Sequence, residues 1–278
     1  MTATDDAASA LLAGAMWSWS AQVFEPARAA RRYARERGSA PVVDAVPPTP
    51  GGGARFSRLW REPRLLEEPT EHDALVVEFD RLAEAYDFYV RPFSGPLFAE
   101  ALDVLAPLLR ADARVLDAGC GPGRELRAVA HRVPAGEVVG VDLAAGMVVG
   151  AHRAAWAAGL DNTAFVQADV GDLPHELDGA FDLVYNCLAH HHYPDPPAAA
   201  AGILRCLRPG GHYAIVDPGP EWFVQISSTL ALAGDPGWIG FHTPEQFRTL
   251  LEDAGFVDVR WYDLLPGFGL ALATAPDP

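Results

Sequence analysis

Short apolar runs alternate along most of the chain with longer stretches in which apolar residues recur every three or four positions. The short runs predict seven strands, at 113–118, 137–142, 163–169, 181–186, 212–218, 257–265 and 269–275. Most of the stretches between them have the periodicity of helices that bury one face. Strands that alternate with helices form a parallel sheet with crossover connections. We therefore expect an α/β fold, a Rossmann-like sheet of seven mostly parallel strands with helices on both faces.

The carboxyl-terminal strands break this alternation. Only the short turn Pro266-Gly267 separates the last two apolar runs, which is too little chain for a crossover helix. The two strands are expected to pair antiparallel at an edge of the sheet, with the last strand antiparallel to the others.

The chain before the first strand divides into several segments. An alanine-rich helical segment ends near Arg37, and a proline- and glycine-rich linker follows at 39–55. Residues 73–89 have helical spacing and are expected to form a helix that covers an apolar surface. We therefore divide the chain into an N-terminal helical extension with its linker, 1–71, and a main domain, 72–278. The uncharged stretch 7–24 contains serines, a glutamine and a glycine, so it is read as a buried or partner-facing helix, with no membrane role.

Charge narrows the range of partners. The 278-residue chain has 37 acidic and 21 basic side chains, a formal net charge of -16, and its basic residues are all arginines. A field of this sign repels phosphate backbones, so no nucleic-acid partner is expected. The arginines at 28, 31, 32, 35 and 37 are read as a solvated helix face. The three cysteines suggest neither a disulfide framework nor a zinc site, and they favour a cytoplasmic location.

The strongest motif is VLDAGCGPG at 115–123, where the first strand turns into a helix. Glycines let the backbone approach a ligand, and the helix start offers unpaired N–H groups. A nicotinamide-dinucleotide fingerprint would need a small residue at 124 or, in the other register, at 126. These positions hold Arg124 and Leu126, so both registers fail.

Aspartates end the first three predicted strands. Asp117 would repel a pyrophosphate but suits a cationic ligand, such as the ammonium group of S-adenosylmethionine. Asp142 can accept hydrogen bonds from ribose hydroxyls, and Asp169 can accept one from an adenine amino group. Each aspartate alone could equally be a turn or helix cap. Together, at neighbouring strand ends, they predict a site for S-adenosylmethionine.

These segments resemble the successive motifs of the class I S-adenosylmethionine-dependent methyltransferases, with greatest similarity to the small-molecule, ubiquinone/menaquinone methyltransferase-like group. The matching segments are 115–123, 141–147, 167–172, 181–195 and 207–217, and the helix at 73–89 resembles that group's lid helix. The resemblance spans about 77–275. Ala144 departs from it, because relatives often have a helix-capping serine there.

The resemblance implies a role for each matched residue. Asp117, Gly119 and Gly121 would hold the methionine portion, at the loop that ends with Gly123. Asp142 would hold the ribose. Leu143 and Met147 would pack on the faces of the adenine, and Asp169 and Val170 would contact its edge. Asn186 would lie beside the methyl group. Tyr86 on the lid helix would close over the cofactor.

The catalytic candidates follow the fourth and fifth strands. His191 and His192 belong to a run of three histidines after the fourth strand, and Asp217 ends the fifth. With Tyr86, they are our candidates for the catalytic site. The histidines could equally brace their loop, and no second ligand set accompanies them, so no metal site is expected.

An aromatic, glycine-rich insertion at 218–243 is expected to cap the substrate, with Trp222, Phe223, Trp238 and Phe241 as its apolar wall. The expected activity is methyl transfer to a small, partly apolar molecule, such as a secondary metabolite. The alternative is a protein that binds S-adenosylmethionine without transferring methyl groups, such as a cyclase or binding protein. The N-terminal helix would fold over the active-site mouth or reach a second subunit in a homodimer.

Overall fold

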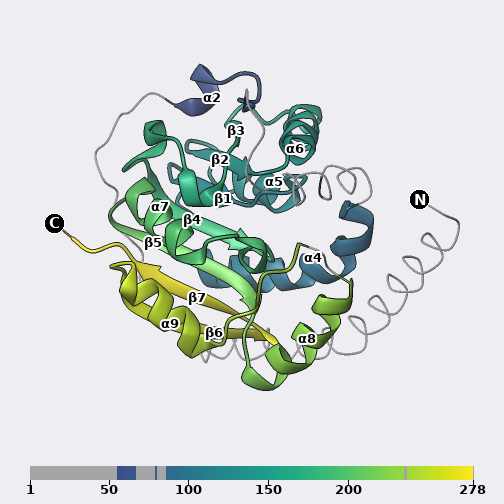
Figure 1. The fold of residues 1–278 in the computed structure, drawn as a ribbon. Coiled ribbons are helices and arrows are strands. Elements are labelled where there is room, and N and C mark those ends of the chain that lie inside the picture. Colours follow the sequence, from purple (N-terminus) through teal and green to yellow (C-terminus); the bar gives the residue numbers. More distant parts are fainter. Residues whose placement is uncertain (1–54, 67–78, 80–85, 235–236, 278) are drawn as a thin grey trace, which may run out of the picture.

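All seven predicted strands are present and form one sheet in the computed structural model, which describes residues 55–66, 79, 86–234 and 237–277. The strands are β1 (Arg114–Ala118), β2 (Glu137–Asp142), β3 (Thr163–Gln167), β4 (Phe181–Cys187), β5 (Leu207–Pro218), β6 (Val257–Leu265) and β7 (Phe268–Thr274). They lie in the order β3-β2-β1-β4-β5-β7-β6 (Figure 1). The strand order therefore reverses between β1 and β4. Such a topological switch point is where open α/β sheets bind ligands.

The antiparallel pairing of the last two strands is confirmed. β7 pairs antiparallel with β5 on one side and with β6 on the other. β6 therefore runs parallel to the first five strands and forms the edge, while β7 is the one antiparallel strand, inserted beside it. The tight turn between them places Gly267 at φ 87°, a conformation that favours glycine.

Helices cover both faces of the sheet, as predicted. One face packs against α4 (Tyr86–Leu105), α5 (Arg124–Ala130) and α6 (Ala145–Ala157), and the other against α2 (Phe56–Leu59), α7 (Pro196–Cys206) and α9 (Pro244–Asp253). Each face has its own cluster of buried side chains, and the central strands are apolar on both sides. Burying each large apolar side chain contributes roughly 1.5–3 kcal/mol to folding.

Local capping explains where the helices on the second face begin. The Asp195 side chain accepts a hydrogen bond from the Ala198 N–H (2.9 Å) at the start of α7. Thr243 and Gln246 form a capping box at the start of α9, as the pattern Thr-x-x-Gln at 243–246 predicts. The run Arg208-Pro209-Gly210-Gly211 predicts that α7 stops at Arg208. It ends two residues earlier because Leu207 already pairs with Phe181 as the first residue of β5.

Residues 55–66 pack against the sheet, although the sequence places them in the N-terminal extension. Phe56 is buried, with its ring 6.1 Å from that of Phe181. The Arg64 N–H donates to the Phe165 carbonyl (3.0 Å), and the Gln167 N–H donates to the Arg64 carbonyl (2.7 Å). This short bridge occupies part of the free edge of β3 and so shields it from pairing with another chain.

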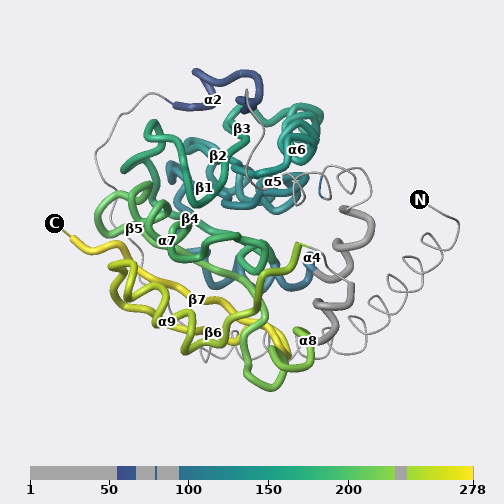
Figure 2. The backbone as a smooth tube through the Cα atoms, in the orientation of Figure 1, coloured from purple at the N-terminus to yellow at the C-terminus, as the bar shows by residue number. Residues whose placement is uncertain are grey.

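Several predicted segments fall wholly or partly outside the described residues. These are the alanine-rich helix with the stretch 7–24, nearly all of the linker, and most of the lid helix 73–89, of which Phe79 is described as helical. Residues 86–89 belong to α4, which continues to Leu105. The insertion 218–243 contains a helix, α8 (Glu221–Gly234), which follows β5 (Figure 2).

Candidate functional site

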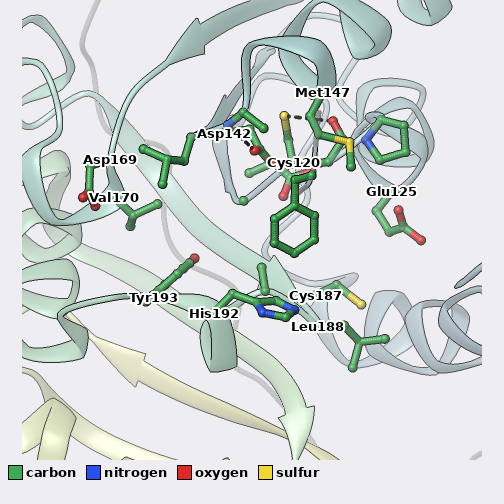
Figure 3. A pocket seen from close by; sticks show the side chains of 18 of the residues that line it. Cys120, Glu125, Asp142, Met147, Asp169, Val170, Cys187, Leu188, His192 and Tyr193 are labelled. Carbon is green, nitrogen blue, oxygen red and sulfur yellow. Dashed lines mark hydrogen bonds between the residues drawn. The ribbon is translucent and has the colours of Figure 1, made fainter. Parts of the chain in front are cut away.

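A cavity opens at the carboxyl ends of β1, β2, β3 and β4, the edge where the sequence places its aspartates. It encloses about 940 Å³ when the space at its open mouth is included. Figure 3 shows Asp169 and Val170 at one end and Glu125 toward the other, with Met147 across from His192. The lining combines carboxylates with apolar side chains, so the cavity offers an elongated ligand both polar and apolar walls.

The loop after β1 shapes the cavity floor. Gly119 has φ 80°, and a Cβ at this position would lie 2.6 Å from the Cβ of Ala189, in the loop after β4. The two loops on either side of the sheet's switch point therefore meet with no room for a side chain. Gly121 lines the cavity as well, at φ 49°. Gly123 is not part of the described lining; a Cβ at this position would lie 2.8 Å from the Cβ of Ala151 in α6, so the glycine allows the loop to pack against that helix.

Asp117 is the most buried carboxylate of the cavity lining, with 2% of its surface exposed. Its Oδ2 accepts a hydrogen bond from the Tyr185 hydroxyl (2.7 Å). Burial raises the pKa of Asp117 well above its usual value, and the Tyr185 bond opposes that shift. A buried carboxylate of this kind gains most from a cation, and an ammonium group supplies the charge that it lacks.

Asp142 links the glycine loop to the start of α6. Its Oδ2 accepts from the Gly121 N–H (2.8 Å) and its Oδ1 accepts from the Ala144 N–H (3.0 Å). The carboxylate thus ties the glycine loop to Ala144, the N-cap residue of α6, which has no side-chain cap of its own. A carboxylate has roughly four acceptor positions, so these two bonds do not by themselves exhaust its capacity for hydroxyl donors.

The adenine residues predicted from the resemblance line one region of the cavity. Leu143, Met147, Asp169 and Val170 all belong to the lining. The Asp169 Oδ1 accepts from the Gly171 N–H (2.7 Å) and caps the short helix η1 (Val170–Asp172). The cap interpretation of this aspartate is therefore confirmed, and its contact with the cofactor is a proposal.

Two polar residues that the sequence analysis missed also line the cavity, beyond the glycine loop. Glu125, in the first turn of α5, accepts from the Ser94 hydroxyl (3.2 Å) and from Arg124 (3.3 Å). The only available signal was the position of Glu125 two residues after the glycine motif. Ser94 comes from α4, more than twenty residues upstream, so only the fold brings it to the site.

The histidine run forms a short helix, η3 (His190–His192), and only His192 of the three lines the cavity. Its Nδ1 lies 2.9 Å from the Gly237 carbonyl oxygen, and its ring meets Phe79 edge-on, with centroids 5.0 Å apart. A carbonyl oxygen only accepts, so the proton of this bond belongs to His192 Nδ1. His190 is buried beneath, against Phe247, and burial lowers its pKa well below the usual value.

His191 and Asp217 form a buried pair behind the cavity wall. The His191 Nδ1 lies 2.7 Å from Oδ1 of Asp217, and neither residue is part of the described lining. The His191 carbonyl also accepts from the Ile239 N–H (2.8 Å) of the insertion. The pair is therefore placed to position the histidine turn and the insertion, one layer away from a ligand.

Some predicted site residues do not reach the cavity. Asn186 is fully buried on the opposite face of the sheet, where its amide donates to the Tyr213 hydroxyl (2.9 Å). This position gives no support to its predicted place beside the methyl group, because neighbouring side chains on a strand point to opposite faces. Cys187 and Leu188 line the cavity instead. The side chain of Tyr86 lies outside the described residues.

The aromatic residues of the insertion also stay outside the cavity lining. Trp222 is mostly exposed, Phe223 packs on Phe268, and Phe241 packs on the His191 ring. Leu188 was not foreseen at all. It lines the cavity with φ 56°, a left-handed conformation that a leucine rarely adopts and that concentrates at functional sites.

In the described part of the chain, no group of three or more histidine, cysteine, aspartate or glutamate side chains is placed to hold a metal ion. No helix among the described residues has both the length and the apolar character needed to span a bilayer.

The cavity has the features that the expected cofactor needs. Asp117 offers a buried carboxylate to an ammonium group, Asp142 offers acceptors to hydroxyls, and Met147 and Leu143 offer apolar surfaces to a flat ring. The residues present therefore fit S-adenosylmethionine.

Comparison with known proteins gives an independent result. A family model described as a methyltransferase domain matches residues 115–211. Nocamycin O-methyltransferase from Saccharothrix syringae is 34% identical over 204 residues, which cover 66% of this chain and 72% of that protein. Demethylmenaquinone methyltransferase from Thermus thermophilus is 32% identical over 216 residues, which cover 69% of this chain and 96% of that protein.

The fold also has solved counterparts. A SAM-dependent methyltransferase from Aquifex aeolicus aligns with a TM-score of 0.55 and 21% identity, covering 72% of this chain and 97% of that structure. At this identity the likeness concerns the fold alone.

Proposed function

The chain belongs to the class I S-adenosylmethionine-dependent methyltransferases, and from this premise we propose how its cavity binds the cofactor and where the acceptor molecule enters. Methyl transfer from S-adenosylmethionine to a small molecule is the activity that its relatives support. The alternative, cofactor binding without methyl transfer, is not favoured by relatives that are themselves named methyltransferases. The acceptor is a partly apolar molecule, in keeping with a lining that includes Phe79 and Leu188.

The cofactor would extend along the cavity from Asp169 toward Glu125. Asp117 would hold the ammonium group, Asp142 the ribose hydroxyls, and Asp169 with Val170 the adenine edge. Leu143 and Met147 would pack on the adenine faces, and the Gly119–Gly121 backbone would leave room for the methionine portion. Gly123 would act indirectly, through the packing of α5 on α6.

S-adenosylmethionine supplies a methyl group on a positively charged sulfur, an excellent leaving group. The protein's contribution is then to align the acceptor, exclude water and hold any proton that the acceptor loses. His192 faces the cavity and is our candidate for contact with the acceptor. His191 and Asp217 would support it from behind, and Tyr86 would close the site from the lid helix.

The burial of Asp117 within the lining is the observation that carries this proposal. A buried carboxylate whose described hydrogen bond comes from a neutral hydroxyl, that of Tyr185, is costly, so its presence in the cavity lining favours a cationic ligand. A dinucleotide would instead bring a pyrophosphate toward it. The proposal thus predicts a preference for S-adenosylmethionine and S-adenosylhomocysteine over nicotinamide dinucleotides.

Calorimetric titration of the full chain tests that preference. S-adenosylmethionine and S-adenosylhomocysteine should bind in one-to-one stoichiometry, and NAD and NADP should give no heat of binding under the same conditions. A chain that binds a dinucleotide and ignores both adenosyl ligands would overturn the cofactor assignment.

We also propose that the chain acts in the cytoplasm, without a nucleic-acid partner, and that its N-terminal extension either covers the active-site mouth or forms a homodimer. The free cysteines Cys120, Cys187 and Cys206 and the net charge of -16 support the first two points. Removal of residues 1–54 tests the third. Loss of the dimer in sedimentation supports an assembly role, and a fall in turnover with an unchanged cofactor affinity supports a cap. Unchanged assembly and turnover would contradict both.

A further inference from the structure

We propose that residues 55–66 form a strap that positions the cavity wall beside the adenine, with Gln167 as the positioning residue between the strap and that wall. The inference rests on the proposed function, because it takes Leu143 as part of the adenine subsite. It adds a residue to the cofactor site. It also gives a role to a segment that the sequence places in the N-terminal extension.

The strap is anchored at its first residues to the amino-terminal ends of the strands. Phe56 is buried, and its ring stacks on that of Trp60, with centroids 4.5 Å apart. The Ser57 N–H donates to Oε1 of Glu137 (2.5 Å), the first residue of β2, whose side chain is fully buried. An apolar contact and a charge-assisted hydrogen bond therefore fix this end of the strap.

The last residues of the strap run along the free edge of β3 (Figure 1). Arg64 makes two main-chain hydrogen bonds to this strand, one through its N–H (3.0 Å) and one through its carbonyl (2.7 Å). Its guanidinium lies 4.7 Å from the centroid of the Trp60 ring and pairs with Glu176 (3.0 Å). These contacts hold the chain that follows, as far as Leu66, beside Gln167.

The Gln167 side chain joins the strap to the loop after β2. It is buried, with 9% of its surface exposed. Its Oε1 accepts from the Leu66 N–H (3.1 Å), and its Nε2 donates to the Leu143 carbonyl (3.0 Å). An N–H only donates and a carbonyl oxygen only accepts, so the two partners fix the orientation of the amide. A side chain must therefore offer both a donor and an acceptor to make this link.

Leu143 is the residue at which β2 gives way to the cavity wall. It follows Asp142, the last residue of β2, and both residues line the cavity. Asp142 lies opposite Gln167 in the pairing of β2 with β3, and its carbonyl accepts from the Ala168 N–H (3.1 Å). The bond from Gln167 adds a hydrogen bond one residue past the strand. It thus fixes the Leu143 carbonyl, and with it the first residue of the loop.

A flat ring binds best against a wall that is already in place. Where a ligand must order the wall as it binds, the cost of ordering is subtracted from the free energy of binding. In the proposed complex, Leu143 packs on a face of the adenine, and Gln167 acts behind it without touching the cofactor. Loss of the Gln167 side chain should therefore weaken binding, because the Leu143 carbonyl loses its donor and the wall is less ordered.

Calorimetric titration of the full chain with S-adenosylhomocysteine tests the role of Gln167. Gln167→Leu has a similar volume but neither a donor nor an acceptor, and we expect the affinity to fall about 3- to 30-fold. Gln246→Leu is the matched control. The Gln246 side chain also accepts from a main-chain N–H, that of Thr243 (2.8 Å), but at the exposed start of α9 and outside the described lining. Its affinity should stay within about twofold of wild type.

Gln167→Glu separates the hydrogen bonds from the packing of the side chain. An ionised glutamate can accept from the Leu66 N–H but cannot donate to the Leu143 carbonyl, whereas a protonated carboxyl group can do both. The affinity of this variant, divided by that of wild type at the same pH, should therefore rise as the pH is lowered from about 8 to about 5. The same ratio for Gln167→Leu should stay constant. A glutamate variant that remains as weak as the leucine variant throughout would contradict the proposed link.

A further variant tests the strap itself. Leu66→Pro removes the N–H that donates to Gln167, and we expect the affinity for S-adenosylhomocysteine to fall about 2- to 10-fold. In the double variant Leu66→Pro/Gln167→Leu, the loss should be little greater than in Gln167→Leu alone, because both changes break one connection. Losses that multiply would mean that the strap does not act through Gln167, and they would overturn the inference.

The outcomes also separate this inference from the proposed function. A wild-type chain that does not bind S-adenosylhomocysteine would contradict both. A wild-type chain that binds it, together with a Gln167→Leu variant of unchanged affinity, would overturn the role of the strap and leave the cofactor assignment intact. Equal losses in Gln167→Leu and Gln246→Leu would overturn that role as well, because a general loss of stability would then explain the effect.

Discussion

Asp217 meets His191 in a buried hydrogen bond, with the His191 Nδ1 2.7 Å from the Asp217 Oδ1, one layer behind the cavity wall. The other Asp217 oxygen has no described hydrogen-bond partner. The bond joins the end of β5 to the histidine turn, and through the His191 carbonyl it reaches Ile239 of the insertion. These contacts explain how three segments far apart in sequence, the end of β5, the histidine turn and the insertion, are held together behind the cavity wall.

Replacement of Asp217 should therefore affect stability more than cofactor binding. Asp217→Ala leaves the buried His191 N–H without its acceptor, and we expect the free energy of unfolding to fall by about 1–3 kcal/mol. Asp217→Asn retains an acceptor oxygen and should lose less. Urea unfolding measures both, and an alanine variant as stable as wild type would mean that the bond contributes nothing.

Asp142→Ala should weaken the binding of S-adenosylmethionine by about 10- to 100-fold, the equivalent of losing one charge-assisted hydrogen bond at about 1.5–3 kcal/mol. The structure adds a second reason for this loss, because the Gly121 and Ala144 N–H groups lose their shared acceptor. Calorimetric titration measures the affinity. Asp172→Ala, at an exposed aspartate of η1, is the control, and equal affinities for the two variants would remove Asp142 from the site.

Gly119→Ala separates steric contact from backbone strain when it is compared with Gly159→Ala. Both glycines have positive φ, 80° and 71°, so each alanine should cost about 1–2 kcal/mol of stability. Only at Gly119 would the new Cβ meet another atom, on Ala189, whereas nothing lies within 4 Å at Gly159. We expect at least a tenfold loss of cofactor affinity for Gly119→Ala alone. Full affinity in that variant would mean that the loop after β1 tolerates displacement.

Buried His190 should make the protein less stable in mild acid. Its pKa is lowered mainly by burial and also by the nearby charges of His242 and His191. Below the ordinary value of 6.5, the unfolded chain takes up a proton that the folded chain resists, so stability falls as pH falls through this window. The slope contributed by one such group is at most about 1.4 kcal/mol per pH unit.

Comparison with His190→Leu isolates this contribution, because Asp117 has a raised pKa and acts with the opposite sign. The free energy of unfolding, measured in urea between pH 5 and 7, should depend less steeply on pH in the variant. The same slope in both proteins would contradict the assignment.

The sequence predicted those parts of the fold and site that depend on local pattern. Apolar runs identify all seven strands, and the aspartates at their carboxyl ends lie beside one cavity because parallel strands end at the same edge. The capping box at Thr243 was equally local and was found.

Features that depend on distant contacts could not be predicted in this way. Ser94 reaches the cavity only because α4 packs on α5, and the Arg64 bridge needs the free edge of β3. Asn186 was assigned to the cavity by motif position. The strand's alternation instead turns it toward Tyr213, and Leu188, at positive φ, occupies the wall.

The central claim is that S-adenosylmethionine binds in the acid-lined cavity at the switch point of the sheet. A crystal structure of the full chain with S-adenosylhomocysteine tests it most directly. The account predicts the ligand's amino group at Asp117, its ribose hydroxyls at Asp142 and its adenine beside Val170. A ligand bound elsewhere, or bound here with its adenine at Glu125 and its amino group at Asp169, would contradict it.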